Sequence, residues 1–148
     1  MKKVEVRNLY SVQVKRIVAL IILIICTSVL HAGEVLNIDN KTLKELIQNN
    51  VPVIDVRTTT EWKETGVVKG SHLLMFYDEE GKYDLDKWLS DVAEIADKNQ
   101  PMILICHSGS RSKQLAKYLT KVEGYEKVYN VKRGIQSWIK KNNHVIQF

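Results

Sequence analysis

The stretch MILICHSGSRS, residues 102–112, decides how this chain folds. Its first four residues, Met102 to Ile105, are all apolar, which is typical of a strand buried on both faces of a sheet. A helical apolar pattern follows at positions 115, 116, 118 and 119. The residues between these two patterns are rich in serine and glycine, so the stretch predicts a strand that turns sharply into a helix.

Cys106 is therefore expected at the point where the strand becomes the helix. Backbone N–H groups converge at such a turn, and the helix dipole favours negative charge there. A cysteine in this position is favoured as a thiolate, and we predict that Cys106 is a nucleophile. The alternative is a small buried apolar residue at a strand end. The Gly-Ser-rich turn and the nearby Arg111 favour the nucleophile.

Apolar strands and helical patterns alternate along the chain on both sides of this stretch. Short strands are predicted at 35–38, 53–56 and 128–131. A helix is predicted at 43–50, and a second one over 85–96 is capped by Asp84. A last helix begins near residue 134, with Ile135, Trp138 and Ile139 facing inward.

This order predicts an α/β fold, because continuous apolar strands separated by helices form a central parallel sheet with helices on both faces. Ligands of such sheets bind at the carboxyl ends of the strands, and Cys106 follows one of these ends. The sequence therefore predicts an active-site loop at residues 106–112.

The first 33 residues differ from the rest in composition. They carry five basic residues and one acidic residue, and so account for +4 of the total net charge of +5. An apolar run of 14 residues, Ile17 to Leu30, follows the basic part, and Ala32 then ends a pattern typical of a secretory signal peptide. The run is shorter than the roughly 20 residues that span a bilayer. Leu30 is a poor residue for the cleavage site, so an uncleaved membrane anchor stays open.

We therefore expect residues 1–33 to be a signal peptide or N-terminal membrane anchor, and residues 34–148 to form an exported, periplasmic domain. Membrane contact is expected only through the N-terminal segment. The domain itself has a net charge of about +1, which does not indicate nucleic-acid binding. Cys106 is its single cysteine, which excludes an internal disulfide and a C-x-x-C oxidoreductase. His72 has no partner at ligand spacing, so no metal site is expected.

Four segments of the chain, in order, resemble the single-domain rhodaneses, a family of sulfurtransferases. They extend over nearly the whole predicted domain, from residue 35 to about 140. The segments are the C-x-x-G-x-R-[ST] loop at Cys106–Ser112, the D-x-R of Asp55-Val56-Arg57, the region from Glu61-Trp62 to Leu73, and the closing Val131–Trp138. The resemblance implies a rhodanese-like fold.

The resemblance also implies a reaction. Cys106 would take sulfane sulfur from a small anionic donor, thiosulfate or a polysulfide, and hold it as a persulfide. A thiol, or cyanide in an assay, would accept it, and no cofactor would be needed. Asp55 and Arg57 would give structural support. The remaining loop residues would bind the substrate, and they are His107, Ser108, Gly109, Ser110, Arg111 and Ser112.

Several alternatives remain open at this point. Arg111 is able to contact the donor or to pair with a structural carboxylate, and His107 to determine specificity or to point to solvent. The protein is either an enzyme, a sulfane-sulfur carrier for a membrane enzyme, or a non-catalytic protein-binding module. The related phosphatases have a loop one residue longer than Cys106–Arg111, which disfavours phosphatase activity.

Two positions depart from the family pattern. Val67 replaces a frequent histidine, and we expect it to alter only surface packing. Arg133 replaces a usual glycine and adds a cation that we expect near the mouth of the site.

Overall fold

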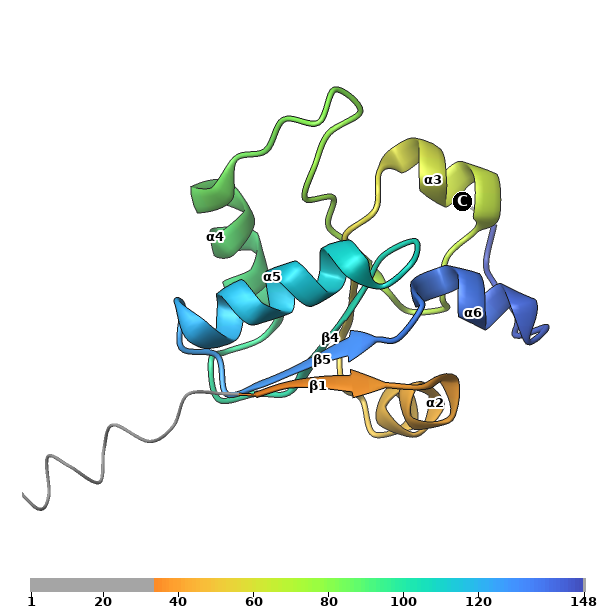
Figure 1. The fold of residues 1–148 in the computed structure, drawn as a ribbon, viewed down its shortest axis with the longest axis horizontal. Coiled ribbons are helices and arrows are strands. Elements are labelled where there is room, and N and C mark those ends of the chain that lie inside the picture. Colours follow the sequence, from red (N-terminus) through yellow and green to blue (C-terminus); the bar gives the residue numbers. More distant parts are fainter. Residues whose placement is uncertain (1–33, 148) are drawn as a thin grey trace, which may run out of the picture. The chain divides into compact units, whose positions relative to one another are not determined.

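The computed structural model describes residues 34–147, and within them strands and helices alternate along the chain (Figure 1). All five strands in this part of the chain belong to one parallel sheet with the order β1-β5-β4-β2-β3. The strands are β1 (Glu34–Ile38), β2 (Val53–Asp55), β3 (His72–Leu73), β4 (Met102–Ile105) and β5 (Lys127–Val131). The predicted α/β fold with a central parallel sheet is confirmed.

The strand β4 lies in the middle of the sheet, between β5 and β2. Its four residues are completely buried, because helices cover both faces of the sheet at this point. Side chains of a strand alternate between the two faces. Leu104 accordingly packs in the core on one side, while Ile103 and Ile105 pack in the core on the other. The apolar sequence of β4 is thus explained by burial on two faces.

Helices α4 and α5 cover one face of the sheet, while α2 and α6 cover the other. Figure 1 shows α4 and α5 above the strands and α2 below them. The first core contains Trp88 and Val92 of α4 with Leu115 and Leu119 of α5. The second contains residues such as Leu43 of α2 and Trp138 of α6. The helices are α2 (Asn40–Gln48), α3 (Thr59–Thr65), α4 (Leu85–Ile95), α5 (Ser110–Lys121) and α6 (Gly134–Lys140).

The predicted strands and helices agree with the observed ones to within a few residues, and Asp84 caps α4 by accepting the Lys87 N–H. Three expectations were wrong or incomplete, in addition to the two-residue edge strand β3, which was not predicted. Ile139 was expected to face inward, but it is 39% exposed because it lies on the outer side of the short helix α6. Val67 is buried and bonds to Ile146 through its backbone, so its effect is not confined to the surface.

The third difference is α3, a helix that the apolar periodicity did not indicate. Its N-terminus is a capping box, in which the Thr58 hydroxyl accepts the Glu61 N–H and the Glu61 carboxylate accepts the Thr58 N–H. The helix is short and buries a single residue, Trp62, so no apolar stripe marks it in the sequence.

The predicted signal or anchor segment, residues 1–33, lies outside the described residues. Within residues 34–147, no helix is both long enough and apolar enough to cross a bilayer.

Candidate active site

Cys106 follows β4 directly and lies at the base of the loop that leads into α5. It is completely buried, and its Sγ accepts the Gly109 N–H at 3.1 Å. The Ser112 Oγ lies 3.3 Å from the same sulfur. Gly109 is the N-cap of α5 and has a left-handed backbone, with φ of 88°. The predicted strand-to-helix turn is therefore present, and a backbone N–H and a hydroxyl lie against the sulfur.

The first turn of α6 holds this loop in place. The N–H groups of Ile135 and Gln136 donate to the carbonyl oxygens of Cys106 and His107, at 2.9 and 3.2 Å. These two carbonyls thus turn toward α6, while the Gly109 N–H faces the sulfur. A Cβ atom on Gly134 would lie only 2.1 Å from the Cys106 carbonyl oxygen, so the close packing of α6 on the loop requires glycine.

Gly109 is constrained in a similar way on the other side of the loop. A Cβ atom at this position would come within 2.8 Å of both the Arg133 backbone nitrogen and the Val131 carbonyl oxygen. The loop and the β5–α6 turn are thus in backbone contact. Arg133 is exposed and has a positive φ of 65°, a conformation that favours glycine. The backbone of Arg133 therefore lies beside the loop.

Asn130 of β5 extends the polar surroundings of the thiol into the sheet. Its side chain is 2% exposed, and its Oδ1 accepts the Ser112 hydroxyl at 2.6 Å. Its Nδ2 donates to Oδ1 of Asn37 on the neighbouring strand β1 at 2.8 Å. Asn130 was not among the predicted site residues. A polar residue inside the buried run Val128–Val131 was the available signal, because a buried polar group needs partners.

Arg111 forms a bidentate ion pair with Glu61 of α3. Its Nη1 donates to Oε2 at 2.9 Å, and its Nη2 bonds to Oε1. Burial raises the pKa of Glu61, but bonds from Arg111 and the Thr58 N–H outweigh it, so the pKa falls below its ordinary value. The same bond to Glu61 raises the pKa of Arg111. Glu61 was not among the predicted site residues, although the pattern Thr58-x-x-Glu61 marks it as a capping residue.

His107, Ser108 and Ser110 form the outer side of the loop. The hydroxyls of Ser108 and Ser110 lie 3.1 Å apart. Nε2 of His107 bonds to Gln136 of α6 at 2.8 Å, and its Nδ1 lies 3.8 Å from Glu61. The His107 side chain is 42% exposed. The structure thus places the predicted loop residues in one group, with the sulfur on the inside and these three side chains outside.

Asp55 and Arg57 form a second ion pair, at the end of β2. Both side chains are completely buried, and Arg57 Nη2 lies 2.7 Å from Asp55 Oδ2. The guanidinium also donates to the Thr65 hydroxyl and to the Gly66 carbonyl, at 2.6 and 2.8 Å. This pair joins the end of β2 to the last turn of α3. Within the described part of the chain, the side-chain hydrogen bonds of Arg57 go to Asp55 and to residues 61–66 and not to the loop.

The rhodanese-like domain family matches residues 39–141, which include every element from α2 to α6. The chain belongs to this family. A mitochondrial protein of Arabidopsis thaliana named HIGH ARSENIC CONTENT 1 is 29% identical over 107 residues, which are 72% of this chain and 63% of that protein. The thiosulfate sulfurtransferase GlpE of Coxiella burnetii is 26% identical over 95 residues, 64% of this chain and 78% of its own length.

Solved structures agree with this assignment at the level of the fold. The polysulfide-sulfur transferase homodimer of Wolinella succinogenes is 22% identical and superposes with a TM-score of 0.58. The similarity covers 76% of this chain and 78% of that chain. The rhodanese-like domain therefore shares its fold with this transferase. Its relatives that are named thiosulfate sulfurtransferases support membership of the sulfurtransferase family at a general level.

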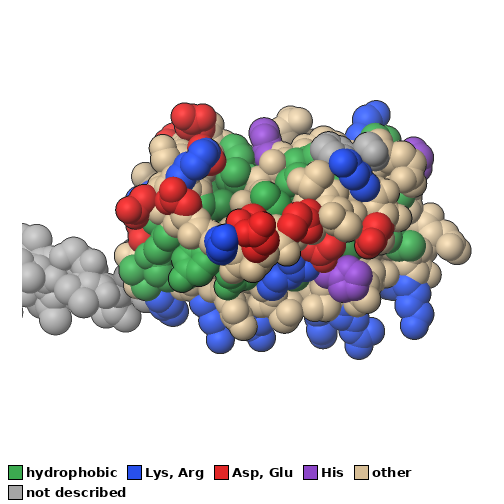
Figure 2. Space-filling model, turned by 90° about the horizontal axis from the view of Figure 1, so that it is seen from above, with side chains coloured by type: hydrophobic (Ala, Val, Ile, Leu, Met, Phe, Trp, Pro, Cys, Tyr) green, Lys and Arg blue, Asp and Glu red, His purple; other side chains and the backbone are tan. Residues whose placement is uncertain are grey.

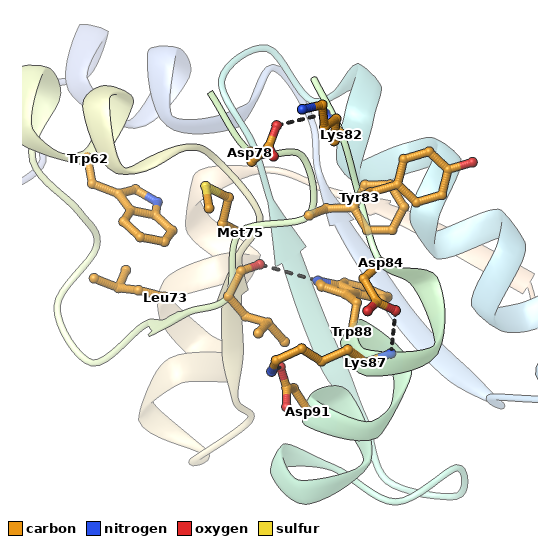
Figure 3. A pocket seen from close by; sticks show the side chains of 12 residues that line it. Trp62, Leu73, Met75, Asp78, Lys82, Tyr83, Asp84, Lys87, Trp88 and Asp91 are labelled. Atoms are coloured by element: carbon orange, nitrogen blue, oxygen red, sulfur yellow. Dashed lines mark hydrogen bonds and ion pairs between the residues drawn. The ribbon is translucent and has the colours of Figure 1, made fainter. Parts of the chain in front are cut away.

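The rhodanese-like domain also carries a hollow of about 590 Å³ beside α4, and no residue of the loop 106–112 lines it. Figure 3 shows Trp62 and Leu73 on one side of it and Tyr83 and Trp88 on the other. Three aspartates and two lysines surround the apolar centre, namely Asp78, Asp84, Asp91, Lys82 and Lys87. This hollow is thus separate from the thiol. Among residues 34–147, no group of three or more potential ligands is arranged to hold a metal ion.

Proposed function

We propose that this rhodanese-like domain is a sulfurtransferase that carries sulfane sulfur as a persulfide on Cys106. The observation that supports this most directly is the surroundings of the sulfur. Cys106 is completely buried at the end of the central strand, and its Sγ faces a backbone N–H and a hydroxyl. A structural cysteine in an apolar core needs neither group, whereas a thiolate or persulfide anion is stabilised by the N–H and by the hydroxyl once it turns toward the sulfur.

The transfer is a two-step displacement at sulfur. The Cys106 thiolate attacks the outer sulfur of the donor and forms a new S–S bond, while the donor's own bond to that sulfur breaks. When thiosulfate is the donor, sulfite leaves with the bonding electron pair. When a polysulfide is the donor, the leaving group is the polysulfide shortened by one sulfur. An acceptor thiolate, or cyanide, then attacks the outer sulfur of the persulfide and releases the Cys106 thiolate. No electron donor or cofactor is needed.

Arg133 is the cation that we expect to draw an anionic donor to the loop. Both terminal nitrogens of Arg111 are bonded to Glu61, so its charge is already paired. Arg133 is exposed, and its backbone lies against Gly109. Lys132 next to it is exposed as well. Carboxylates are prominent on the face of the molecule in Figure 2, with lysine and arginine side chains along its lower border. We expect an anionic donor to be attracted by the exposed Lys132 and Arg133.

A sulfane-sulfur carrier for a membrane enzyme is the second candidate. The basic and apolar segment 1–33 favours it, because export or anchoring would place the domain beside a membrane on its outer side. The similarity in fold to a polysulfide-sulfur transferase makes polysulfide a donor that the experiment must include. A non-catalytic protein-binding module would need neither the Cys106 thiol nor polar groups around its sulfur.

Intact mass spectrometry tests the proposal. The purified protein is incubated with thiosulfate or with polysulfide, and we expect a gain of one sulfur atom that cyanide removes. Cys106→Ser should show no gain, and the exposed Ser108→Ala serves as a matched loop control that retains it. If wild-type protein gains no sulfur from either donor, both the enzyme and the carrier are excluded. Fast turnover with small thiols supports an enzyme, and a stable persulfide that small thiols remove slowly supports a carrier.

The location outside the cytoplasm is tested separately. Protein isolated from its native membrane and soluble fractions is sequenced from the N-terminus. A sequence that begins after Ala32 supports a cleaved signal peptide. Retention of residues 1–32 in the membrane fraction supports an anchor, and full-length protein in the cytosol contradicts export.

A further inference from the structure

A chain of three polar side chains connects the buried thiol with the edge of the sheet. Ser112 lies between Cys106 Sγ and Asn130 Oδ1, at 3.3 and 2.6 Å. Asn130 in turn donates to Asn37, which lies opposite it in the register of β5 and β1. Asn130 is 2% exposed, whereas Asn37 is exposed on β1, the edge strand of the sheet.

The single proton of the Ser112 hydroxyl restricts which hydrogen bonds these three side chains can form at one time. The Ser112 hydroxyl has one proton but two neighbours within hydrogen-bond distance. Oδ1 of Asn130 has no proton, so a contact of 2.6 Å places the hydroxyl proton between these two oxygens. Ser112 then accepts from the thiol S–H instead of donating to it. The observed arrangement therefore suits the protonated thiol.

A thiolate needs the opposite arrangement. Once Cys106 has lost its proton, the Ser112 hydroxyl must turn to donate to the sulfur. Oδ1 of Asn130 would then face a serine oxygen without a proton between them. A half-turn of the Asn130 amide presents Nδ2 to Ser112, and a half-turn of the Asn37 amide presents its Nδ2 to Asn130. No proton travels along the chain, because the thiol proton leaves to water while the hydroxyl and the two amides turn.

We propose that Asn130 and Asn37 form an amide relay that sets the direction of the Ser112 hydroxyl and thereby the ease with which Cys106 becomes a thiolate. Both asparagines are positioning residues, since neither contacts the sulfur. The relay deepens the proposed function, because it controls the reactive form of Cys106. It also gives the buried thiol a connection to a surface position at the far strand of the sheet.

The exposed end of the relay provides the test. Asn37→Asp introduces a carboxylate that only accepts, so it holds Nδ2 of Asn130 toward itself and Oδ1 toward Ser112. The hydroxyl then stays turned away from the sulfur. The midpoint of the pH profile of Cys106 alkylation should move up by about one pH unit, which corresponds to losing one hydrogen bond to a charged group. Alkylation by iodoacetamide measures the thiolate directly and does not depend on sulfur transfer.

Two further variants separate the relay from a simple charge effect. Leu36→Asp places the same charge one residue away, on the opposite face of β1, at a side chain that is 43% exposed. We expect it to move the midpoint by less than about 0.3 pH units because solvent screens an exposed charge. Ser112→Ala removes the link, so Asn37→Asp should have no effect in that background. Denaturation curves check that each variant is folded.

The charged side chains around the loop are unchanged in these variants. They come from the loop itself, from α5, from α3, from the end of β2 and from the β5–α6 turn. These groups are His107, Arg111, Glu61, the Asp55–Arg57 pair and Arg133.

Equal shifts in Asn37→Asp and Leu36→Asp overturn the relay, and so does a shift that persists without the Ser112 hydroxyl. No shift in Asn37→Asp overturns it too. If the relay passes this test but no persulfide forms on the wild-type protein, the relay stands and the sulfurtransferase function fails, so the two outcomes are distinguishable.

Discussion

Two arginine–carboxylate pairs connect α3 with the rest of the domain, and they differ in burial. In the Asp55–Arg57 pair both side chains are 0% exposed, and Arg57 makes further bonds to Thr65 and Gly66. In the Glu61–Arg111 pair the side chains are 22% and 29% exposed. The first pair is enclosed by the fold, while the second belongs to the rim of the thiol loop.

The same arginine–carboxylate pairing thus supports folding in one place and the reactive loop in the other. A buried charge without its partner is very costly, so the inner pair has to stay intact for the domain to fold. A pair that is partly open to solvent contributes little to stability and is able to respond to ions, salt and pH. We therefore expect changes in the inner pair to affect folding, and changes in the outer pair to affect reactivity more than folding.

The largest effect is expected for Arg57→Met. It leaves the Asp55 carboxylate buried without a cation, and we expect the free energy of unfolding to fall by about 3 to 5 kcal/mol. Urea denaturation followed by fluorescence measures this loss. The double variant Asp55→Leu, Arg57→Met is the matched control and should be more stable than the single one, because no unpaired charge remains. A loss below about 1 kcal/mol in the single variant would mean that burial does not separate the two pairs.

Arg111→Met should act mainly on the reaction. It leaves the Glu61 carboxylate without its cation beside the loop, and this change of one charge should slow sulfur transfer from thiosulfate to cyanide by about tenfold, the size expected from a neighbouring charge near the protein surface. The free energy of unfolding should fall by only about 1 kcal/mol. Arg111→Lys retains the charge but loses the bidentate geometry, so it should keep most of the rate. Equal rates for the Met and Lys variants would contradict a role for the charge.

Glu61→Gln should have the opposite effect on the reaction from Arg111→Met. It frees the Arg111 charge from its carboxylate, and we expect the KM for thiosulfate to fall by about threefold, with stability lowered by about 1 kcal/mol. Steady-state kinetics at low and high salt measure the change, and high salt should reduce it. Glu64→Gln on the same helix α3 is a matched control that should leave KM unaltered. A higher KM in Glu61→Gln would show that the pairing itself helps the donor to bind.

The smallest effect concerns pH. The pKa of Glu61 in the folded protein lies below its ordinary value of 4.5, because bonds from Arg111 and Thr58 outweigh the effect of burial. Ionised Glu61 therefore stabilises the fold above pH 4.5, and this contribution is lost as the pH falls through the lower folded value. The stability difference between wild type and Glu61→Gln should shrink over that range. A difference that is constant from pH 5.5 down to pH 3, a window of about 2.5 units around the carboxyl pKa values, would contradict this.

The strand-turn-helix arrangement around Cys106 could be predicted because its signals are local. Four apolar residues, a glycine and a helical pattern lie next to one another in the sequence, and the backbone at each is governed by its immediate neighbours. The Asp84 cap could be predicted for the same reason. The inward position predicted for Ile139 was wrong, because periodicity defines an apolar stripe but not how much of a seven-residue helix the sheet covers.

The partners of the site could not be predicted in this way. Arg111 and Glu61 are 50 residues apart in the sequence, and Asn130 and Asn37 are 93 apart. From the sequence alone, Arg111 could have paired with a carboxylate from anywhere in the chain. The choice depends on where α3 lies relative to α5 and on the register of β1 against β5.

The sequence alone thus determined which residue is the candidate nucleophile and on what kind of turn it lies, since both follow from short-range patterns. The pairing of Arg111 with Glu61, and the connection of the Cys106 thiol through Ser112 and Asn130 to the sheet edge, depend instead on tertiary packing. Such contacts arise when parallel strands are aligned and helices pack on them, and neither arrangement is encoded in any single stretch of the chain.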